Sequence, residues 1–354
     1  MRIAIVTDAW KPQVNGVVQT LTRTRENLEA AGHEVLMITP VGRRSVGCPT
    51  YPEIRLSLFP GRAVRRELDA FGADCVHIAT EGPLGLAARR YCIKRKTPFV
   101  TSYHTQFPEY VRARLPIPTR LTYRILRWFH GAALRTLVPT ARIKQKLAAH
   151  GFQNVAVWTR GVDAGVFSPH QPIDYNLPRP NWVHMGRLSI EKNIEQFLQL
   201  ELPGSKVLVG DGPDRERLES RYPDAHFLGY RFGTELAAHL AGGDVFVFPS
   251  RTDTFGLVML EAMACGLPIA AYPVEGPIDV VSNGVTGVLD EDLGSACIAA
   301  LALDKQHCRD YAERRSWRAA TRQFERHLIS AVNGARCDHG ATHAKSSATT
   351  TTPL

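Results

Sequence analysis

The sequence predicts an α/β protein made of two doubly wound parallel sheets that face each other across a cleft. Twice along the chain, a short strand pattern leads into a glycine-containing loop, a helix pattern and another strand, which is typical of parallel α/β sheets. The length of 354 residues is too great for one ordinary domain. A stretch with four prolines, residues 169–180, lies between the two patterns and indicates a linker.

Residues 1–170 form the expected first domain. A strand at 3–7 is followed by a loop with Asn15 and Gly16, then by a helix at 17–31 and a strand at 34–39. Further strands are expected at 75–79, 98–103, 136–138 and 155–159, with a helix at 85–94.

Residues 171–333 form the expected second domain. A last helix at about 304–332 ends this half and is expected to pack back on the first domain. Residues 334–354 are small and polar, and we expect a disordered tail. The strands of this half are expected at 182–187, 206–210, 226–229, 245–248 and 268–271.

Composition restricts the class of protein. Hydrophobic residues make up 44% of the chain and charged residues 22%, as in a soluble globular protein. No apolar run reaches eighteen residues and no basic-then-apolar leader precedes the first strand, so we expect a cytoplasmic protein. Seven scattered cysteines without metal spacing fit that reducing compartment.

The net charge of +9 is unevenly distributed. Residues 1–170 contain 25 Lys and Arg against 11 Asp and Glu, whereas the remainder contains 18 against 23. The first half is therefore expected to face an anionic partner. Between residues 107 and 135, cations alternate with large apolar side chains, which suits either an ordinary domain helix or an interfacial helix on anionic lipid. We expect a peripheral contact with an anionic membrane through Arg112, Arg114, Arg120, Arg124, Arg127 and Trp128.

The most informative segment runs from Asp253 to Glu261. It follows an apolar strand pattern and enters a helix that would begin at Gly256, where backbone N–H groups can bind phosphate. Glu261 lies about 7.5 Å further along the helix axis, an offset that suits the ribose of a nucleotide. Alternatively, Asp253 only caps the helix and Glu261 is solvated. The apolar neighbours of Glu261 favour a buried carboxylate, which needs a partner.

Several motifs occur in the order found in retaining, nucleotide-sugar-dependent glycosyltransferases of group 1, or family 4. They are residues 12–17, 161–167 and 186–193, and the turn Gly210-Asp211-Gly212-Pro213. The chain resembles this family over roughly residues 1–330. The resemblance implies the GT-B fold, with two Rossmann-like domains. It also implies transfer of a hexosyl group, with retention, from a UDP- or GDP-sugar to a hydroxyl of a lipid or lipid-linked saccharide at the inner face of the cell membrane.

The chain departs from the family at one acid. The family has two glutamates separated by seven residues, whereas here Asp253 takes the place of the first and Glu261 matches the second. Residues 252–256 resemble a subgroup of sulfoquinovosyl and mannosyl transferases that build glycolipids. The shorter acid leaves the identity of the donor sugar open.

The resemblance also implies roles for single residues. Arg187 and Lys192 would neutralise the departing diphosphate, and His104 and Asp253 would contact the sugar at the reaction centre. Glu261 would bind the ribose. If the resemblance is set aside, Arg187 and Lys192 can be ordinary surface cations at the start of a helix. His104 can then be a structural histidine, and Gly16 a glycine of a simple turn. The remaining expected donor-binding positions are Gly16, Gly186, Phe255, Gly256 and Leu257.

No metal or other cofactor is expected, because the acidic residues 290–292 suit a solvated loop better than a magnesium site. Two rival functions stay open: a nucleotide-sugar epimerase on the same fold, and a basic nucleic-acid-binding protein. The chain contains no recognised nucleic-acid-binding module, so we expect no nucleic-acid partner. A phosphorylase is disfavoured because the sequence offers no convincing lysine for a pyridoxal cofactor. A dinucleotide dehydrogenase is disfavoured because neither half has Gly-x-Gly-x-x-Gly after its first strand.

Overall fold

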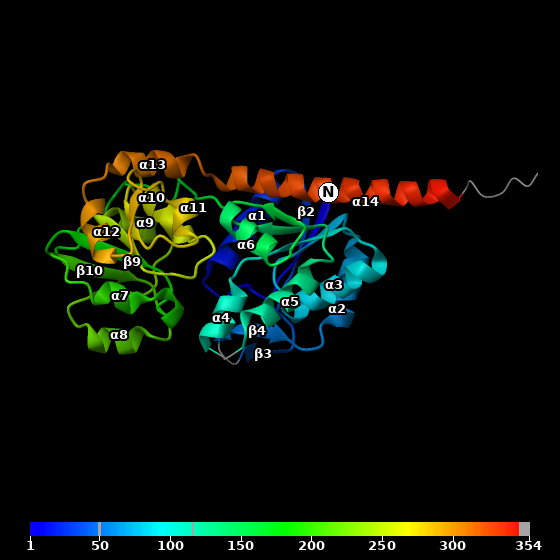
Figure 1. Cartoon of the computed structure of the whole chain (residues 1–354), viewed down its shortest axis with the longest axis horizontal. Coiled ribbons are helices and arrows are strands. Elements are labelled where there is room, and N and C mark those ends of the chain that lie inside the picture. The colour runs from blue at the N-terminus through cyan, green and yellow to red at the C-terminus, as the bar shows by residue number, and fades with distance from the viewer. Residues whose placement is uncertain (49–50, 115–116, 347–354) are drawn as a thin grey trace, which may run out of the picture.

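The computed structural model describes residues 1–48, 51–114 and 117–346, and it contains two six-stranded sheets and one small hairpin (Figure 1). Every pairing within the two large sheets is parallel. The sheets lie side by side, one in each half of the chain. The predicted fold class is confirmed.

The first sheet has the strand order β2-β1-β5-β6-β7-β8. Its strands are β1 (Arg2–Val6), β2 (Glu34–Ile38), β5 (Cys75–Ile78), β6 (Phe99–Ser102), β7 (Arg135–Val138) and β8 (Val155–Val157). The helices of this half are α1 (Gly16–Ala30), α2 (Gly61–Phe71), α3 (Pro83–Arg95), α4 (Phe107–Arg114), α5 (Thr119–His130) and α6 (Ala141–Ala149). The sequence did not predict α2 or the antiparallel hairpin of β3 (Ser45–Cys48) and β4 (Tyr51–Ser57).

The second sheet has the order β11-β10-β9-β12-β13-β14. Its strands are β9 (Asn181–Met185), β10 (Ser205–Val209), β11 (His226–Phe227), β12 (Val245–Phe248), β13 (Ile269–Ala271) and β14 (Gly287–Leu289). The helices are the short 3₁₀ turn η1 (Ile190–Lys192), α7 (Ile194–Leu198), α8 (Arg215–Arg221), α9 (Gly233–Ala241), α10 (Leu257–Ala264), α11 (Pro277–Val280), α12 (Leu293–Ala300), α13 (Lys305–Glu313) and α14 (Trp317–Ser346).

Both sheets reverse their strand order at one point. In the first sheet the reversal lies between β1 and β5, and in the second it lies between β9 and β12. In open α/β sheets, ligands bind beyond the carboxyl ends of the strands at such a switch point. The loops that follow these four strands are therefore the first places to look for a site.

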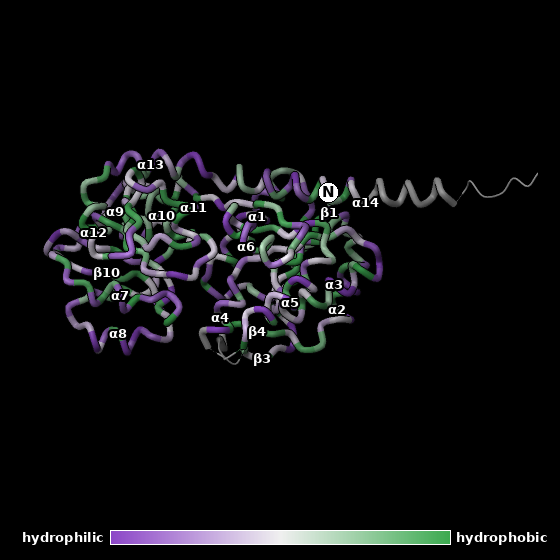
Figure 2. Tube along the Cα trace, in the orientation of Figure 1, coloured by the Kyte–Doolittle hydropathy of each residue, from purple (hydrophilic) through white to green (hydrophobic). Residues whose placement is uncertain are grey.

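The two halves are tied together by the last helix, α14, which runs from the second half across the first (Figure 1). Phe324 of α14 is fully buried and its ring lies 4.6 Å from that of Trp158 and 4.9 Å from that of His77. Figure 2 shows hydrophobic segments in both halves, and buried hydrophobic side chains form a core in each. Burial of this apolar area is the main favourable contribution to folding.

The C-terminal region differs from the prediction in two ways. The expected single helix at 304–332 is two helices, because the chain crosses between the halves where Val162 pairs with Ser316 and the hydroxyl of Ser316 caps the next helix. The expected disordered tail is wrong for residues 334–346, where α14 continues to Ser346. This stretch has no proline and contains alanine, arginine and lysine, which favour helix. Residues 347–354 lie outside the described residues.

Candidate active site between the sheets

The carboxyl edges of the two sheets contact each other. The Thr254 hydroxyl, beyond β12, donates to the backbone oxygen of His104, beyond β6, at 2.7 Å. Lys146 of α6 forms an ion pair of 2.8 Å with Glu275 of the second half. A Cβ added to Gly16 would lie 3.2 Å from the Leu257 side chain. The site therefore takes residues from both halves.

Lys192 and Asp253 meet at the switch point of the second sheet. Lys192 follows β9 and Asp253 follows β12, and the Lys192 Nζ lies 2.7 Å and 2.9 Å from the two carboxylate oxygens. The two side chains are only 24% and 17% exposed. The pairing itself was not predicted from the sequence, which placed each residue separately on the donor.

Asp253 stays ionised in spite of its burial. Burial alone would raise the pKa of this carboxyl, but the charge of Lys192 and its hydrogen bonds outweigh burial and leave the pKa below its usual value. Truncating one partner of a buried pair leaves an uncompensated charge. The structure thus places a fixed positive and negative charge together where a ligand would bind.

Glu261 lies in α10 and is only 5% exposed, so the solvated alternative is wrong. Its carboxyl accepts a hydrogen bond of 2.6 Å from the Gln19 side chain of α1. Burial raises the pKa of Glu261 to about 7, although the Gln19 hydrogen bond and Arg23 act in the opposite direction. Among the described residues, the Gln19 amide is the side chain that donates to this buried carboxyl, so the carboxyl can accept further hydrogen bonds.

Helix α10 begins at Leu257 with Gly256 as its N-cap, close to the predicted start. Gly256 has a φ of 81°, and a Cβ there would lie 2.6 Å from the Met259 side chain. Only glycine adopts this left-handed turn at low cost. The side chain of Phe255 is buried in the core, so this residue can offer a ligand only its backbone.

The loop that carries Arg187 is packed against the Gly-Asp-Gly-Pro turn. A Cβ on Gly212 would lie 2.3 Å from the backbone oxygen of Leu188, so the turn requires glycine for this close approach. Gly186 precedes Arg187 at the end of β9. The packing of the two turns holds Arg187 and Lys192 at the same edge of the sheet.

His104 is held by a residue that the sequence did not reveal. Arg160, which is 4% exposed, donates to the His104 Nδ1 over 3.2 Å and lies over the Trp158 ring. Among the described residues Arg160 has no carboxylate partner, and burial lowers its pKa to about 9. Burial and then the charge of Arg160 lower the pKa of His104 well below its usual value. Because guanidinium only donates, the His104 hydrogen lies on Nε2.

Two contributors to the site, Gln19 and Arg160, were thus missed. Gln19 lies 242 residues from its partner Glu261, so no local pattern connects them. Arg160 stands directly before the motif at 161–167 and was a visible but unused signal. Within the described ranges, no group of three or more His, Cys, Asp or Glu residues could hold a metal ion. Asp292 instead caps the N-terminus of α12.

Comparison with known proteins identifies the family of this chain. Residues 14–166 match the family described as Glycosyltransferase Family 4, and residues 179–303 match Glycosyl transferases group 1. The chain is 34% identical to a GDP-mannose-dependent alpha-mannosyltransferase of Mycobacterium tuberculosis, over 82% of this chain and 83% of that protein. The chain belongs to the group 1, family 4 glycosyltransferases. This transferase is also 32% identical to the sulfoquinovosyl transferase of Arabidopsis thaliana, over 86% and 68% of the two chains.

Solved structures share the fold of this glycosyltransferase. Sucrose-phosphate synthase from Thermosynechococcus elongatus has a TM-score of 0.73 at 21% identity, covering 93% of this chain and 99% of that one. Anabaena HepE in complex with UDP and glucose has a TM-score of 0.69 at 17% identity, covering 93% and 100%. The transferase is therefore a GT-B enzyme, and the epimerase and nucleic-acid-binding alternatives have no support.

Proposed function

We propose that this enzyme transfers a hexosyl group from a GDP- or UDP-sugar to a hydroxyl of a lipid or lipid-linked saccharide, with retention and without a metal. The second half binds the donor and the first half binds the acceptor. The relatives named above include GDP-mannose-dependent and sulfoquinovosyl transferases, and two further relatives are alpha-monoglucosyldiacylglycerol synthases of Acholeplasma laidlawii and Streptococcus pneumoniae. These names support a nucleotide-sugar donor and a lipid acceptor for this chain.

The buried carboxyl of Glu261 is the observation that carries the donor assignment. Two ribose hydroxyls would donate to this carboxylate, replace the single bond from Gln19 and favour its ionised form. The diphosphate would then lie toward the N-terminus of α10, near Arg187 and Lys192. Their positive charge would stabilise the negative charge that develops on the leaving diphosphate. Asp253, fixed by Lys192, and the Nε2–H of His104 would face the sugar.

A donor screen tests this assignment. The purified enzyme is incubated with UDP-glucose, UDP-galactose, GDP-mannose and UDP-sulfoquinovose, and nucleotide release is measured with and without lipid acceptors. Lys192→Ala and Glu261→Ala should abolish release. Lys206→Ala is the matched control, since this lysine is also partly buried in the second half but donates to the backbone oxygens of Leu198 and Leu200. Full activity of either site variant would contradict the assignment.

The membrane contact rests on helix α5, which is apolar on two sides. One side, including Tyr123, Leu126 and Phe129, is buried in the first half. The other side carries Leu121, Ile125 and Trp128, which are 49%, 55% and 58% exposed. An ordinary domain helix has only the first of these faces.

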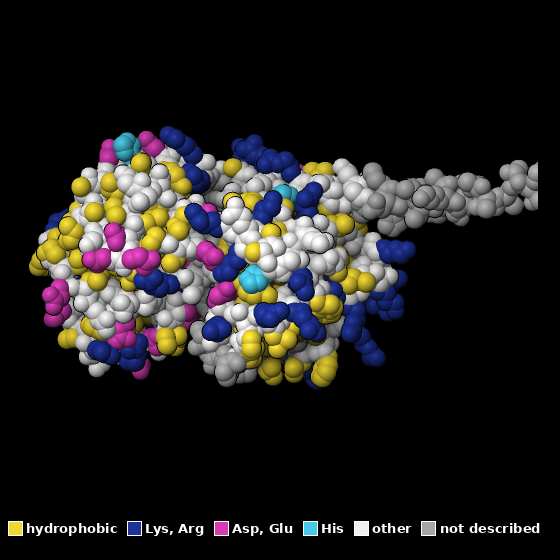
Figure 3. Space-filling view, in the orientation of Figure 1, with side chains coloured by type: hydrophobic (Ala, Val, Ile, Leu, Met, Phe, Trp, Pro, Cys, Tyr) yellow, Lys and Arg dark blue, Asp and Glu magenta, His cyan; other side chains and the backbone are white. Residues whose placement is uncertain are grey.

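Cations surround this exposed stripe. Arg120, Arg124 and Arg127 are exposed on α5, as is Arg112 on α4, while the Arg114 side chain lies outside the described part of the chain. Arg89 of α3 lies 4.0 Å from the Trp128 ring centre. Figure 3 shows Lys and Arg side chains dense over this half and acidic side chains gathered on the other. Exposed apolar side chains rimmed by cations suit the surface of an anionic bilayer.

Vesicle flotation tests the contact. The enzyme should float with phosphatidylglycerol vesicles and remain below with phosphatidylcholine vesicles, and binding should weaken in high salt. Ile125→Ser should reduce flotation, whereas Ile298→Ser, at a similarly exposed position on α12 of the second half, should not. Binding that ignores lipid charge would contradict the proposal. Among the described residues, no helix has both the length and the apolar character needed to cross a bilayer.

A further inference from the structure

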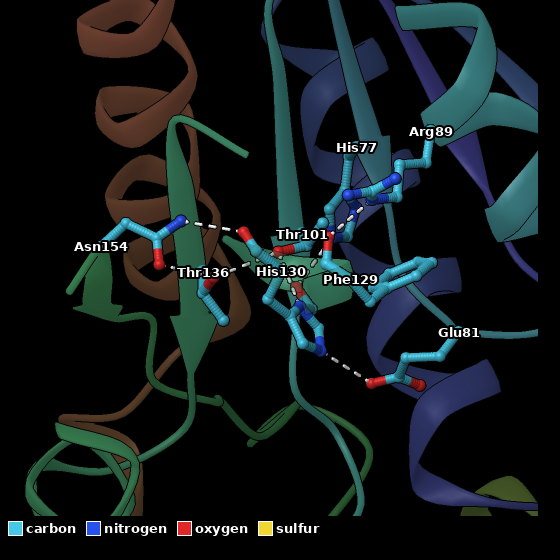
Figure 4. Close-up of polar contacts among 9 residues, drawn as sticks. His77, Glu81, Arg89, Thr101, Phe129, His130, Thr136 and Asn154 are labelled. Carbon is cyan, nitrogen blue, oxygen red and sulfur yellow. Dashed lines mark hydrogen bonds and ion pairs between the residues drawn. The ribbon is translucent and has the colours of Figure 1, made fainter. Parts of the chain in front are cut away.

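A row of hydrogen-bonded polar side chains in the first half ends at Glu81, which has no role in the proposed donor site (Figure 4). His130, the last residue of α5, is fully buried and contacts Glu81 through Nε2 at 3.1 Å and the Thr101 hydroxyl through Nδ1 at 2.8 Å. Thr101 contacts the Thr136 hydroxyl at 3.3 Å, and Thr136 contacts the Asn154 side-chain oxygen at 3.2 Å.

The direction of these hydrogen bonds is fixed from one end. The Asn154 amide nitrogen donates to the backbone oxygens of His130 and Ala133, so its side-chain oxygen is an acceptor. Thr136 must then donate to Asn154, and Thr101 must donate to Thr136. Each hydroxyl has one hydrogen, so Thr101 can only accept from His130, whose Nδ1 therefore carries a hydrogen.

This assignment determines what Glu81 offers to a ligand. One further proton lies between the His130 Nε2 and the Glu81 Oε1, either on the imidazole or on the carboxyl. In both cases Oε2 of Glu81 is a hydrogen-bond acceptor. The Glu81 side chain is 31% exposed, and His130 is its only hydrogen-bond partner among the described residues.

Glu81 also lies on the edge of the sheet that faces the second half. Strands β5 and β6 are hydrogen-bonded neighbours with Ile78 opposite Thr101. Glu81 follows Ile78 by three residues, and His104 follows Thr101 by three residues. Neighbouring strands lie about 4.8 Å apart, so both side chains leave the same edge. His104 is the residue that contacts Thr254 of the donor half.

We propose that Glu81 binds the acceptor substrate, an inference that rests on the proposed function. The Glu81 Oε2 would accept a hydrogen bond from a hydroxyl of that substrate and orient the hydroxyl toward the donor sugar. His130 is the positioning residue that holds the carboxyl. The ligand class is a hydroxylated headgroup or saccharide. A lipid-linked acceptor would leave the bilayer near Glu81, because His130 is the last residue of α5, the helix that carries the exposed side chains of Leu121, Ile125 and Trp128.

Glu81→Ala is the sharpest test. Alanine removes both carboxyl oxygens, so the acceptor contact is lost, and at this partly exposed position water can take the place of the carboxyl at the His130 Nε2. Transfer is measured to diacylglycerol, phosphatidylinositol and monoglucosyldiacylglycerol in phosphatidylglycerol vesicles. We expect the KM for the acceptor to rise at least tenfold, with the KM for the donor and the hydrolysis of donor without acceptor both within about twofold of wild type.

Glu67→Ala is the control, since Glu67 is 30% exposed in the same half and, within the described part of the chain, forms its ion pair with Arg43 of the loop after β2. Its acceptor KM should not change. An unchanged acceptor KM in Glu81→Ala, or a fall in its donor hydrolysis, overturns the assignment. Absence of donor hydrolysis and transfer in the wild type would instead count against the proposed function.

Discussion

Replacing Glu261 by glutamine should stabilise the free enzyme while destroying its donor site. The wild-type carboxyl has a folded pKa of about 7 against an ordinary value of 4.5. Because the folded state holds the proton more tightly, stability is fully present below pH 4.5 and is lost as the pH rises to 7. A shift of this size corresponds to about 3 kcal/mol. Glutamine keeps an oxygen for Gln19 and does not titrate.

Urea unfolding at a series of pH values tests this expectation. The free energy of unfolding of Glu261→Gln should equal that of the wild type near pH 4 and exceed it by about 3 kcal/mol at pH 8. Glu195→Gln is a control of opposite sign, because pairing with Arg217, Tyr222 and Arg221 lowers the pKa of Glu195. That variant should lose stability only at the higher pH values. A difference for Glu261→Gln that is independent of pH, or reversed, would refute the reasoning.

Three further substitutions have defined outcomes. Asp253→Asn leaves Lys192 without its counter-charge and should lower the unfolding free energy by about 3 kcal/mol and nucleotide release by at least tenfold; an unaffected release rate would remove Asp253 from the site. Gly256→Ala forces a methyl group toward Met259 at positive φ and should lower stability by about 2 kcal/mol, read from urea midpoints. Phe324→Ala removes a buried aromatic side chain of α14 and should lower the free energy of unfolding by about 3–5 kcal/mol, measured by circular dichroism during urea unfolding.

The fold was largely readable from the sequence, because buried parallel strands are short apolar runs between helices. The hairpin of β3 and β4 was missed since Pro52 lies within β4, and proline argues against a strand in a sheet. The tail was assigned to disorder from composition alone, although alanine, arginine and lysine also favour helix. Local patterns thus identify buried elements better than exposed ones.

The local structure of the candidate site could be predicted only where one stretch of sequence held both a strand end and a helix start. That is the case for residues 253–261, whose helix start at Gly256 and Leu257 and whose buried Glu261 match the prediction. The partners that decide the chemistry of these residues lie elsewhere in the chain. Gln19 reaches Glu261 through the packing of the two halves. Lys192 reaches Asp253 within the second half and Arg160 reaches His104 within the first, each between loops that are distant in the sequence, so no local spacing encodes these contacts.

The contacts between the halves bring residues of both to the candidate site. Glu261 depends on Gln19 of the first half, and His104 is joined through its backbone to Thr254 of the second. A donor that replaces the Gln19 bond at Glu261 would remove one of these connections and supply its own hydroxyls to the carboxyl. Glu81 and His104 lie on the sheet edge of the first half, so the proposed acceptor and donor positions meet where the two halves contact each other.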